Sequence, residues 1–76
     1  APGDLSNPEI EDQINKKLST EPLLGEANVN AIVDDESVVL SGTVQDERQH
    51  DLALRIAESY AGDREIVDKI QVQGKS

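Results

Sequence analysis

The sequence predicts a small α+β domain in which two helices cover one face of a three-stranded mixed sheet. Its elements are expected in the order helix, strand, strand, helix, strand. Two segments carry apolar residues at helical spacing, and these are residues 5–20 and 46–61. Three shorter segments alternate as half-buried strands do, and these are residues 28–33, 37–44 and 65–72. Turn-forming residues lie between the segments, so each segment is expected to form one element.

The composition limits the domain to an aliphatic core. The 76 residues suffice for one domain, expected over residues 5–73 between flexible ends at 1–4 and 74–76. Twenty residues are Leu, Ile or Val, whereas Tyr60 is the single aromatic residue. The absence of Cys excludes disulfides and thiolate metal sites, and no cofactor is expected. No stretch approaches the roughly 18 to 20 apolar residues that a membrane-spanning helix needs.

The net charge of −9 argues against nucleic acid as a partner. Proteins that bind DNA or RNA need a basic surface that meets phosphates, and many also stack bases on aromatic rings. This chain instead has 16 acidic and 7 basic residues. Such a surface also repels anionic lipid headgroups at long range.

The first helix, over residues 5–20, is expected to bury a face made by Ile10, Ile14 and Leu18. Ser6 is the expected N-cap, with Glu9 as its capping-box partner. Leu5 then stands at the position of a hydrophobic staple against Ile10. An alternative start places Asn7 at the cap and Pro8 at the first helical position.

The next two segments are close enough in sequence to form an antiparallel hairpin. The first strand turns one face inward through Val29, Ala31 and Val33, and the second through Val38, Leu40, Gly42 and Val44. Ile32 falls on the opposite face of the first strand. Gly42 stands where a core side chain would be, which indicates a bulge or a close approach by another element, and we expect a helix there.

The second helix, over residues 46–61, presents a stripe made by Leu52, Ala53, Ile56, Ala57 and Tyr60. Asp46 is the expected cap, Gln49 its capping-box partner and Gly62 the C-cap. A right-handed crossover then makes the third strand parallel to the second. That strand turns Ile66, Ile70 and Val72 to one face, and Asp68 shares this alternation, so a bulge or an edge position is expected there. The strand order stays open.

This ordered set resembles the BON domain, a family of bacterial osmotically inducible and nodulation proteins. The resemblance runs from about Asn7 to Val72. It is carried by the first helix, by the V-x-L-x-G-x-V rhythm over residues 38–44, by the second helix with Gly62, and by the run Ile66-Val67-Asp68. The chain departs from the family at Asp34-Asp35-Glu36, where Asn-Gly or Asp-Gly is common.

The resemblance implies the same helix-strand-strand-helix-strand fold and a non-catalytic role. It also implies a periplasmic or envelope-associated location in bacteria, with a cytoplasmic location as the alternative, because one cytoplasmic relative senses potassium. The implied roles are phospholipid-surface or protein binding, envelope integrity and protection against osmotic stress. The expected partner is therefore a membrane surface or an envelope protein, and the oligomeric state stays open.

Several residues invite a chemical role, and a simpler interpretation is preferred for each. Asp34, Asp35 and Glu36 offer oxygen ligands to K⁺ or Ca²⁺, but acidic residues are also favoured in solvated turns. His50 lacks the convergent partners of a catalytic or metal-binding histidine, so we expect it to be solvated. Ser41 and Thr43 flank a glycine without the nucleophile-elbow pattern, which indicates strand hydroxyls facing solvent.

Two binding hypotheses follow, and neither includes catalysis. The first is a docking module, which predicts an exposed apolar patch involving Leu23, Leu24 or Ile32. The second is a cation-responsive stress module acting through the acidic turn at residues 34–36. Tyr60 is expected to pack in the core with its hydroxyl at the rim, since it is in phase with Leu52 and Ile56.

Overall fold

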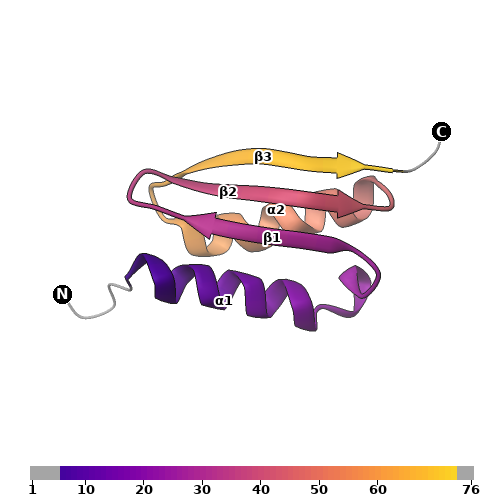
Figure 1. Ribbon diagram of the computed structural model, residues 1–76, viewed down its shortest axis with the longest axis horizontal. Coiled ribbons are helices and arrows are strands. Elements are labelled where there is room, and N and C mark those ends of the chain that lie inside the picture. Colours follow the sequence, from indigo (N-terminus) through magenta and orange to yellow (C-terminus); the bar gives the residue numbers. More distant parts are fainter. Residues whose placement is uncertain (1–5, 74–76) are drawn as a thin grey trace.

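The computed structural model describes residues 6–73 and confirms the predicted fold class (Figure 1). The elements are α1 (Asn7–Thr20), the 3-10 helix η1 (Pro22–Leu24), β1 (Asn28–Val33), β2 (Ser37–Val44), α2 (Glu47–Ala61) and β3 (Glu65–Val72). β2 is the central strand, antiparallel to β1 and parallel to β3. Both relative orientations match the prediction, and the strand order, which the sequence left open, is β1-β2-β3.

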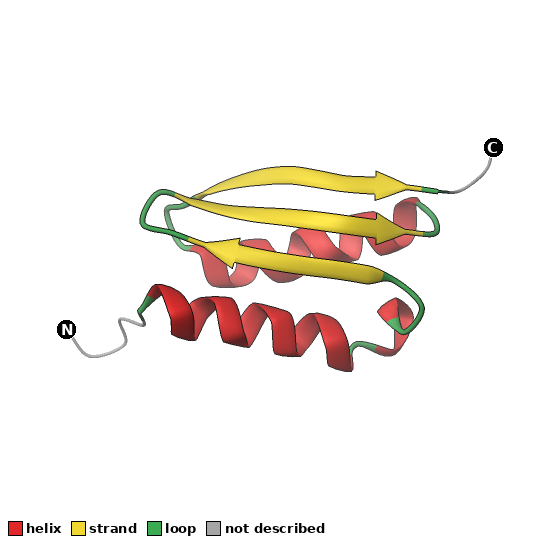
Figure 2. Cartoon of the chain, in the orientation of Figure 1, coloured by secondary structure: helices red, strands yellow, loops and turns green. Residues whose placement is uncertain are grey.

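The two helices lie on the same side of the sheet (Figure 2). α2 packs across β2 and β3, while α1 runs beside β1 and contacts α2. No helix among residues 6–73 covers the opposite side of the sheet, which we call the open face.

The core fills the space between the sheet and the helices, as the alternation predicts. Its buried members are Ile10, Ile14, Leu18, Leu24, Ala31, Val33, Val38, Leu40, Ala53, Ile56, Ala57 and Ala61. Tyr60 is partly buried and packs against this cluster, which confirms its predicted place. Ile32 points to the open face and is 52% exposed. The core is thus aliphatic, and burial of each Ile, Leu or Val contributes about 1.5–3 kcal/mol of transfer free energy.

Local signals set the ends of both helices. Ser6 caps α1, and its hydroxyl accepts from the Glu9 N–H while the Glu9 carboxylate accepts from the Ser6 N–H, so the predicted capping box is present. Asn7 is the first helical residue rather than the cap, so the alternative start is wrong. The predicted staple residue Leu5 lies outside the described residues. Asp46 caps α2 by accepting from the Gln49 N–H, and Gly62 is the C-cap.

Gly42 is needed for a close approach between two strands, and not for the helix contact that the sequence analysis predicted. Its φ of +124° is a conformation that side chains with a Cβ rarely adopt. A Cβ atom built there would lie 1.8 Å from the carbonyl oxygen of Asn28 on β1. The helix interpretation was wrong because burial on the core face suggested a helix neighbour, whereas the neighbour is the backbone of the paired strand.

Side chains of α1 seal the outer edge of β1. The Asn15 amide donates to the Ala31 carbonyl at 3.0 Å and accepts from the Ala31 N–H at 2.8 Å. One turn earlier on α1, the Glu11 carboxylate accepts from the Val33 N–H at 2.9 Å. These contacts replace the hydrogen bonds of a further strand, which leaves β3 as the edge that residues 6–73 do not cover.

Asp68 lies on this β3 edge, as one of the two predicted alternatives required. The paired register of β2 and β3 runs without interruption from Ser37 opposite Glu65 to Val44 opposite Val72. The edge position, and not a bulge, therefore accommodates an acidic side chain on the helix-covered side of the strand.

Replacing Gly42 with Ala should destabilise the domain by about 3 kcal/mol or more, since the new Cβ adds backbone strain to a clash with Asn28. Urea unfolding of Gly42→Ala measures the loss. Gly25→Ala is the matched control, because Gly25 has helical φ and ψ and its added Cβ would lie 3.3 Å from the nearest atom, Pro22 O. A loss below about 1 kcal/mol in Gly42→Ala would show that the two strands separate easily.

Replacing Asn15 with Ala should cost about 1–3 kcal/mol, because the N–H and C=O of Ala31 both lose their partner beside the core. The free energy of unfolding in urea is the readout, and Gln13→Ala on the exposed side of α1 is the control. If both variants were equally stable, water would be replacing the Asn15 side chain at no cost.

Candidate functional site

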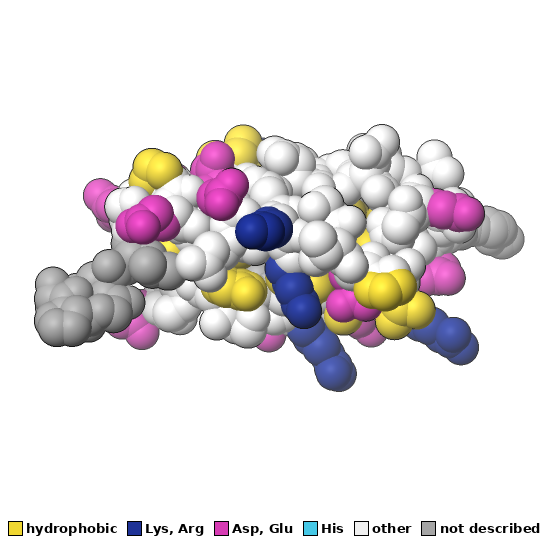
Figure 3. All heavy atoms as spheres, turned by 90° about the horizontal axis from the view of Figure 1, so that it is seen from below, with side chains coloured by type: hydrophobic (Ala, Val, Ile, Leu, Met, Phe, Trp, Pro, Cys, Tyr) yellow, Lys and Arg dark blue, Asp and Glu magenta, His cyan; other side chains and the backbone are white. Residues whose placement is uncertain are grey.

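A concavity lies between η1 and the first half of α2, and we call it the η1–α2 hollow. It is shallow, has a volume of about 490 Å³, and is lined by Leu23, Asp46, Arg48, Gln49, Asp51, Leu52 and Arg55. Figure 3 shows hydrophobic atoms gathered at the end of the molecule where η1 lies, with a basic side chain next to them. The hollow therefore combines apolar and cationic groups at one place.

Two adjacent leucines of η1 have different environments, and only one of them contributes apolar surface to the hollow. Leu24 is buried, with 4% of its surface exposed, and anchors η1 to the core. Leu23 is 69% exposed, the largest fraction of any large hydrophobic residue described. The predicted exposure is therefore confirmed for Leu23 and Ile32 and wrong for Leu24, because one 3-10 turn directs neighbouring side chains to different sides. Ile32 is exposed on the open face, so it forms no patch with Leu23.

Gln49 holds η1 against the start of α2. Its side chain donates to the Leu23 carbonyl at 2.9 Å and accepts from the Gln45 N–H at 2.7 Å. The sequence analysis assigned Gln49 to a capping box with Asp46, and that assignment was wrong in part. Asp46 does accept from the Gln49 N–H at 3.0 Å, but the Gln49 side chain reaches past the cap to residue 45. The backbone that carries Leu23 is thereby fixed beside α2.

The cationic part of the hollow follows from helical spacing. Arg48, Leu52 and Arg55 are separated by four and three residues, so they lie along one face of α2. Asp46 and Asp51 also line the hollow, which makes its formal charge balanced. On a chain with a net charge of −9, a balanced surface repels an anionic partner less than the average surface does. The sequence analysis missed these two arginines, although their spacing was visible.

A second cluster joins α2 to the edge strand. His50 Nε2 lies 2.5 Å from an Asp68 carboxylate oxygen, and His50 Nδ1 lies 3.3 Å from Glu47 Oε1. The other oxygen of Asp68 accepts from the Ile70 N–H at 3.0 Å. The His50 side chain is only 18% exposed, so the prediction of a solvated histidine was wrong. Its partner is 18 residues away in sequence, which a search among near neighbours does not reach.

This geometry shifts the proton affinities of both groups. The hydrogen bond to Asp68 is the main cause of a raised pKa at His50, and burial acts in the opposite direction. Burial acts to raise the pKa of Asp68, but the Ile70 N–H and His50 together outweigh it, so the pKa of Asp68 is lowered. A protonated His50 and an ionised Asp68 thus stabilise each other between α2 and β3.

The acidic turn between β1 and β2 is built by its own hydrogen bonds. One carboxylate oxygen of Asp34 accepts from the Glu36 N–H at 2.9 Å, from the Ser37 N–H at 2.8 Å and from the Ser37 hydroxyl at 3.1 Å. The two N–H groups are the main cause of a lowered pKa at Asp34. Asp35 accepts from the Asn7 amide at 2.8 Å.

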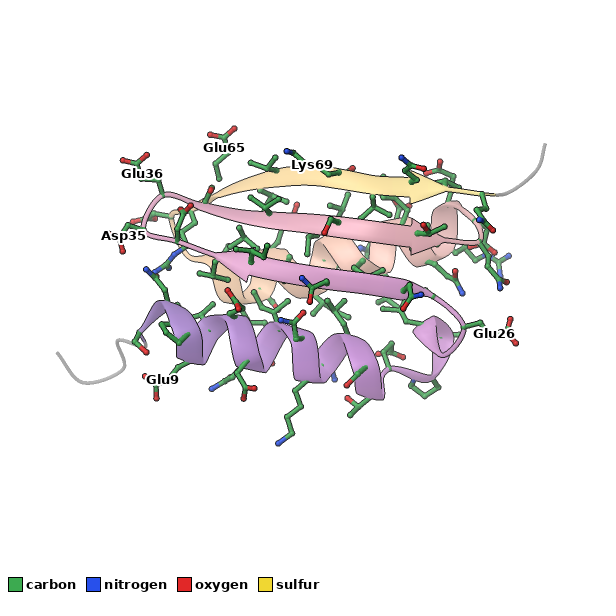
Figure 4. All side chains as sticks on the ribbon, viewed as in Figure 1. Glu9, Glu26, Asp35, Glu36, Glu65 and Lys69 are labelled. Atoms are coloured by element: carbon green, nitrogen blue, oxygen red, sulfur yellow. The ribbon has the colours of Figure 1, made fainter. Side chains whose placement is uncertain are left out.

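The labelled side chains of Asp35 and Glu36 point outward from this end of the molecule (Figure 4). The proposed cation site at residues 34–36 stays a prediction. Among the described residues, Glu47, His50 and Asp51 are the acidic and histidine side chains whose ligand atoms come within 4.8 Å of one another. The turn residues do not form such a group, since Asp34 is directed into the turn.

The remaining candidates occupy structural positions. Ser41 and Thr43 alternate with the buried residues of β2, which places their hydroxyls on the open face as predicted. The open face also carries a row of three apolar side chains that the sheet register brings side by side, and these are Ile32, Val39 and Val67. Within residues 6–73, no helix has the length and apolar character needed to cross a membrane.

The pH dependence of stability tests the His50–Asp68 pair. Because the pKa of His50 is raised on folding, its contribution is complete below the unfolded value of about 6.5 and is lost as pH rises through the folded value. The lowered pKa of Asp68 gives the opposite limit, with the contribution lost as pH falls below about 4. Between these two pH limits we expect the pair to add about 0.5–1 kcal/mol to the free energy of unfolding, since the pair is partly exposed.

Urea unfolding at intervals from acidic to alkaline pH measures this contribution, with His50→Gln as the comparison. The variant should lose the decline in stability above neutral pH that the unmodified chain shows. Parallel curves for the two proteins would mean that the pair contributes nothing.

Comparison with known proteins completes the description of this site and its scaffold. No curated protein matches the chain at the significance required. The family model described as the BON domain matches residues 6–74, which include every element from α1 to β3. The resemblance noted in the sequence is therefore confirmed over nearly the whole chain, and the chain belongs to the BON domain family.

Proposed function

We propose that this BON domain is a non-enzymatic interaction module of the bacterial envelope that docks on phospholipid surfaces through the η1–α2 hollow. Membership of the family supports an envelope-associated, phospholipid-binding role in general terms. Roles in envelope integrity or osmotic stress would be consequences of this docking.

The observation that carries the proposal is the exposure of Leu23 in a hollow that two arginines also line. A leucine that is 69% exposed has apolar surface which the core does not use. Arg48 and Arg55 line the same hollow, and guanidinium groups bind phosphate through paired N–H donors. An exposed apolar side chain in the same hollow as arginines is a composition that favours the boundary between headgroups and acyl chains.

The electrostatics of the rest of the chain would orient this docking. A net charge of −9 repels an anionic membrane, so the acidic surfaces would face away from it. The hollow has two basic and two acidic side chains, so its formal charges balance and add no net repulsion. Insertion of Leu23 contributes about 1.5–3 kcal/mol and each arginine about 1 kcal/mol at most, so a single domain binds weakly and reversibly.

Vesicle co-sedimentation tests this proposal. The intact chain should sediment with vesicles of phosphatidylglycerol and phosphatidylethanolamine and not with pure phosphatidylcholine, because the arginines require an anionic phosphate surface. Leu23→Ser and the double variant Arg48→Ser/Arg55→Ser should each reduce the bound fraction about tenfold.

The matched control is Lys16→Ser/Lys17→Ser, which removes the same charge from exposed positions of α1. An equal loss in this control would transfer the contact to α1. Binding to neither kind of vesicle would reject lipid docking and favour an envelope protein as the partner of the hollow.

A further inference from the structure

We propose that the free edge of β3 pairs with β3 of a second copy of this chain, antiparallel and centred on Val67, to join the two sheets. The inference is independent of lipid docking. The two edges of the sheet differ. Asn15 and Glu11 occupy backbone groups at the β1 edge, whereas nothing among residues 6–73 covers the β3 edge.

The backbone groups available for pairing follow from the hydrogen bonds of β3. The Glu65 N–H donates to the Glu36 carbonyl, and the Gln73 N–H donates to the Val44 carbonyl. Odd-numbered residues of β3 therefore direct their backbone groups toward β2. Even-numbered residues direct theirs outward, since direction alternates along a strand. The outward groups belong to Ile66, Asp68, Ile70 and Val72.

The Asp68 side chain limits how far pairing can extend. Its carboxylate accepts from the Ile70 N–H, so that outward donor is already occupied. The outward backbone groups of Ile66 and Asp68 lie before the occupied N–H of Ile70 in the strand, so they stay available for pairing. When two β3 strands run antiparallel, Ile66 of one copy stands opposite Asp68 of the second copy, and each such pair exchanges both backbone hydrogen bonds.

The charged side chains favour this register over those centred nearer the C-terminus of β3. Glu65 and Lys69 lie along the outer strand of the sheet, where both are labelled in Figure 4. With Val67 opposite Val67 of the second copy, each Glu65 faces a Lys69, which is a favourable cross-strand pair. Moving the centre of pairing one step toward the C-terminus places Asp68 against Asp68, and a further step in that direction places Lys69 against Lys69. Like charges directly opposite are destabilising, so both alternatives are disfavoured.

The apolar row of the open face would become continuous across the joined sheets. Val67 ends the row that starts at Ile32 and passes through Val39, so its pairing with Val67 of the second copy connects the two rows. On the covered side, α2 lies across β2 and β3. With strands about 4.8 Å apart, the two α2 helices would come within about 10 Å, the ordinary distance of packed helices.

Pairing of this kind closes after two copies. Each copy contributes its one free edge, and the β1 edges at the outer ends are sealed by α1. The assembly would have twofold symmetry with no edge left for growth. Because the contact is smaller than a standard interface, we expect a dissociation constant on the order of 0.1–1 mM.

Charge exchange between residues 65 and 69 tests the register. Glu65→Lys and Lys69→Glu should each weaken self-association about fivefold to tenfold, because each places like charges opposite in both symmetry-related pairs. The double variant Glu65→Lys/Lys69→Glu should restore it to within about twofold. Sedimentation equilibrium and amide NMR shifts over a dilution series up to about 2 mM give the constants, a range set by the expected weakness.

Two controls separate the contact from net charge. Glu26→Lys makes the same change of net charge as Glu65→Lys at the opposite end of the molecule (Figure 4), and Lys17→Glu matches Lys69→Glu on α1. Both controls should change association less than the variants in β3. In a mixed sample of labelled and unlabelled chains, a filtered NOE should connect the α protons of Glu65 and Lys69. Within one copy these protons are about 13 Å apart.

A chain that stays monomeric at about 2 mM would overturn the proposal, since the expected constant lies below that concentration. Association that the double variant fails to restore would also overturn it, because the contact would then involve another surface or register.

Discussion

Asn15 is the constraint on which the arrangement of this domain depends. Its side-chain amide makes to Ala31 the pair of hydrogen bonds that a fourth strand would otherwise make. The sheet therefore stops at β1, and α1 is held alongside it in the orientation that turns Ile10, Ile14 and Leu18 into the core. The same contact divides the molecule into a sealed edge and a free edge. The two surfaces proposed for binding, the η1–α2 hollow and the β3 edge, both lie away from this contact.

A core without Phe, Trp or Met depends on close approach of the backbone. Gly42 lets β2 come against Asn28 of β1, and Ala53 and Ala57 let α2 come against the sheet, where both are fully buried. Small side chains lose little conformational entropy on folding, while dense packing recovers dispersion energy that large rings would supply elsewhere. Arg64 then ties the end of the domain together by donating to the Asp34 carbonyl, the Asn7 side chain and the Ala61 carbonyl.

Periodicity predicted the elements because it is a local property, and it could not predict the contacts between them. Apolar residues that repeat every two residues predicted the strands, and those that repeat every three to four predicted the helices. Residue type at the helix starts then predicted the caps Ser6 and Asp46. The strand order depends on contacts between α1 and β1 that no repeat encodes. Similarly, His50 was taken as solvated because Asp68 is distant in sequence. Leu23 and Leu24 were indistinguishable because a single 3-10 turn has no period to read.

The candidate hollow was the least predictable part for the same physical reason. Arg48 and Arg55 were visible as an amphipathic spacing, but their meaning depends on the position of η1, which Gln49 fixes across the gap between two segments. The net charge of the whole chain also gave no sign of the hollow, since a value of −9 sums over surfaces whose local charges differ. Site-level arguments in small domains therefore need the distribution of charge rather than its sum.

The two proposed contacts are geometrically compatible, and their combination addresses the weakness of each. The η1–α2 hollow lies on the helical side of the sheet, whereas the β3 contact joins sheets edge to edge. A twofold axis perpendicular to the joined sheet would place both α2 helices, and both hollows, on the same side. Two weak membrane contacts on one rigid assembly act together, because binding of the first raises the effective concentration of the second. A membrane surface would in turn concentrate the copies and favour their pairing, since linked equilibria reinforce each other in both directions.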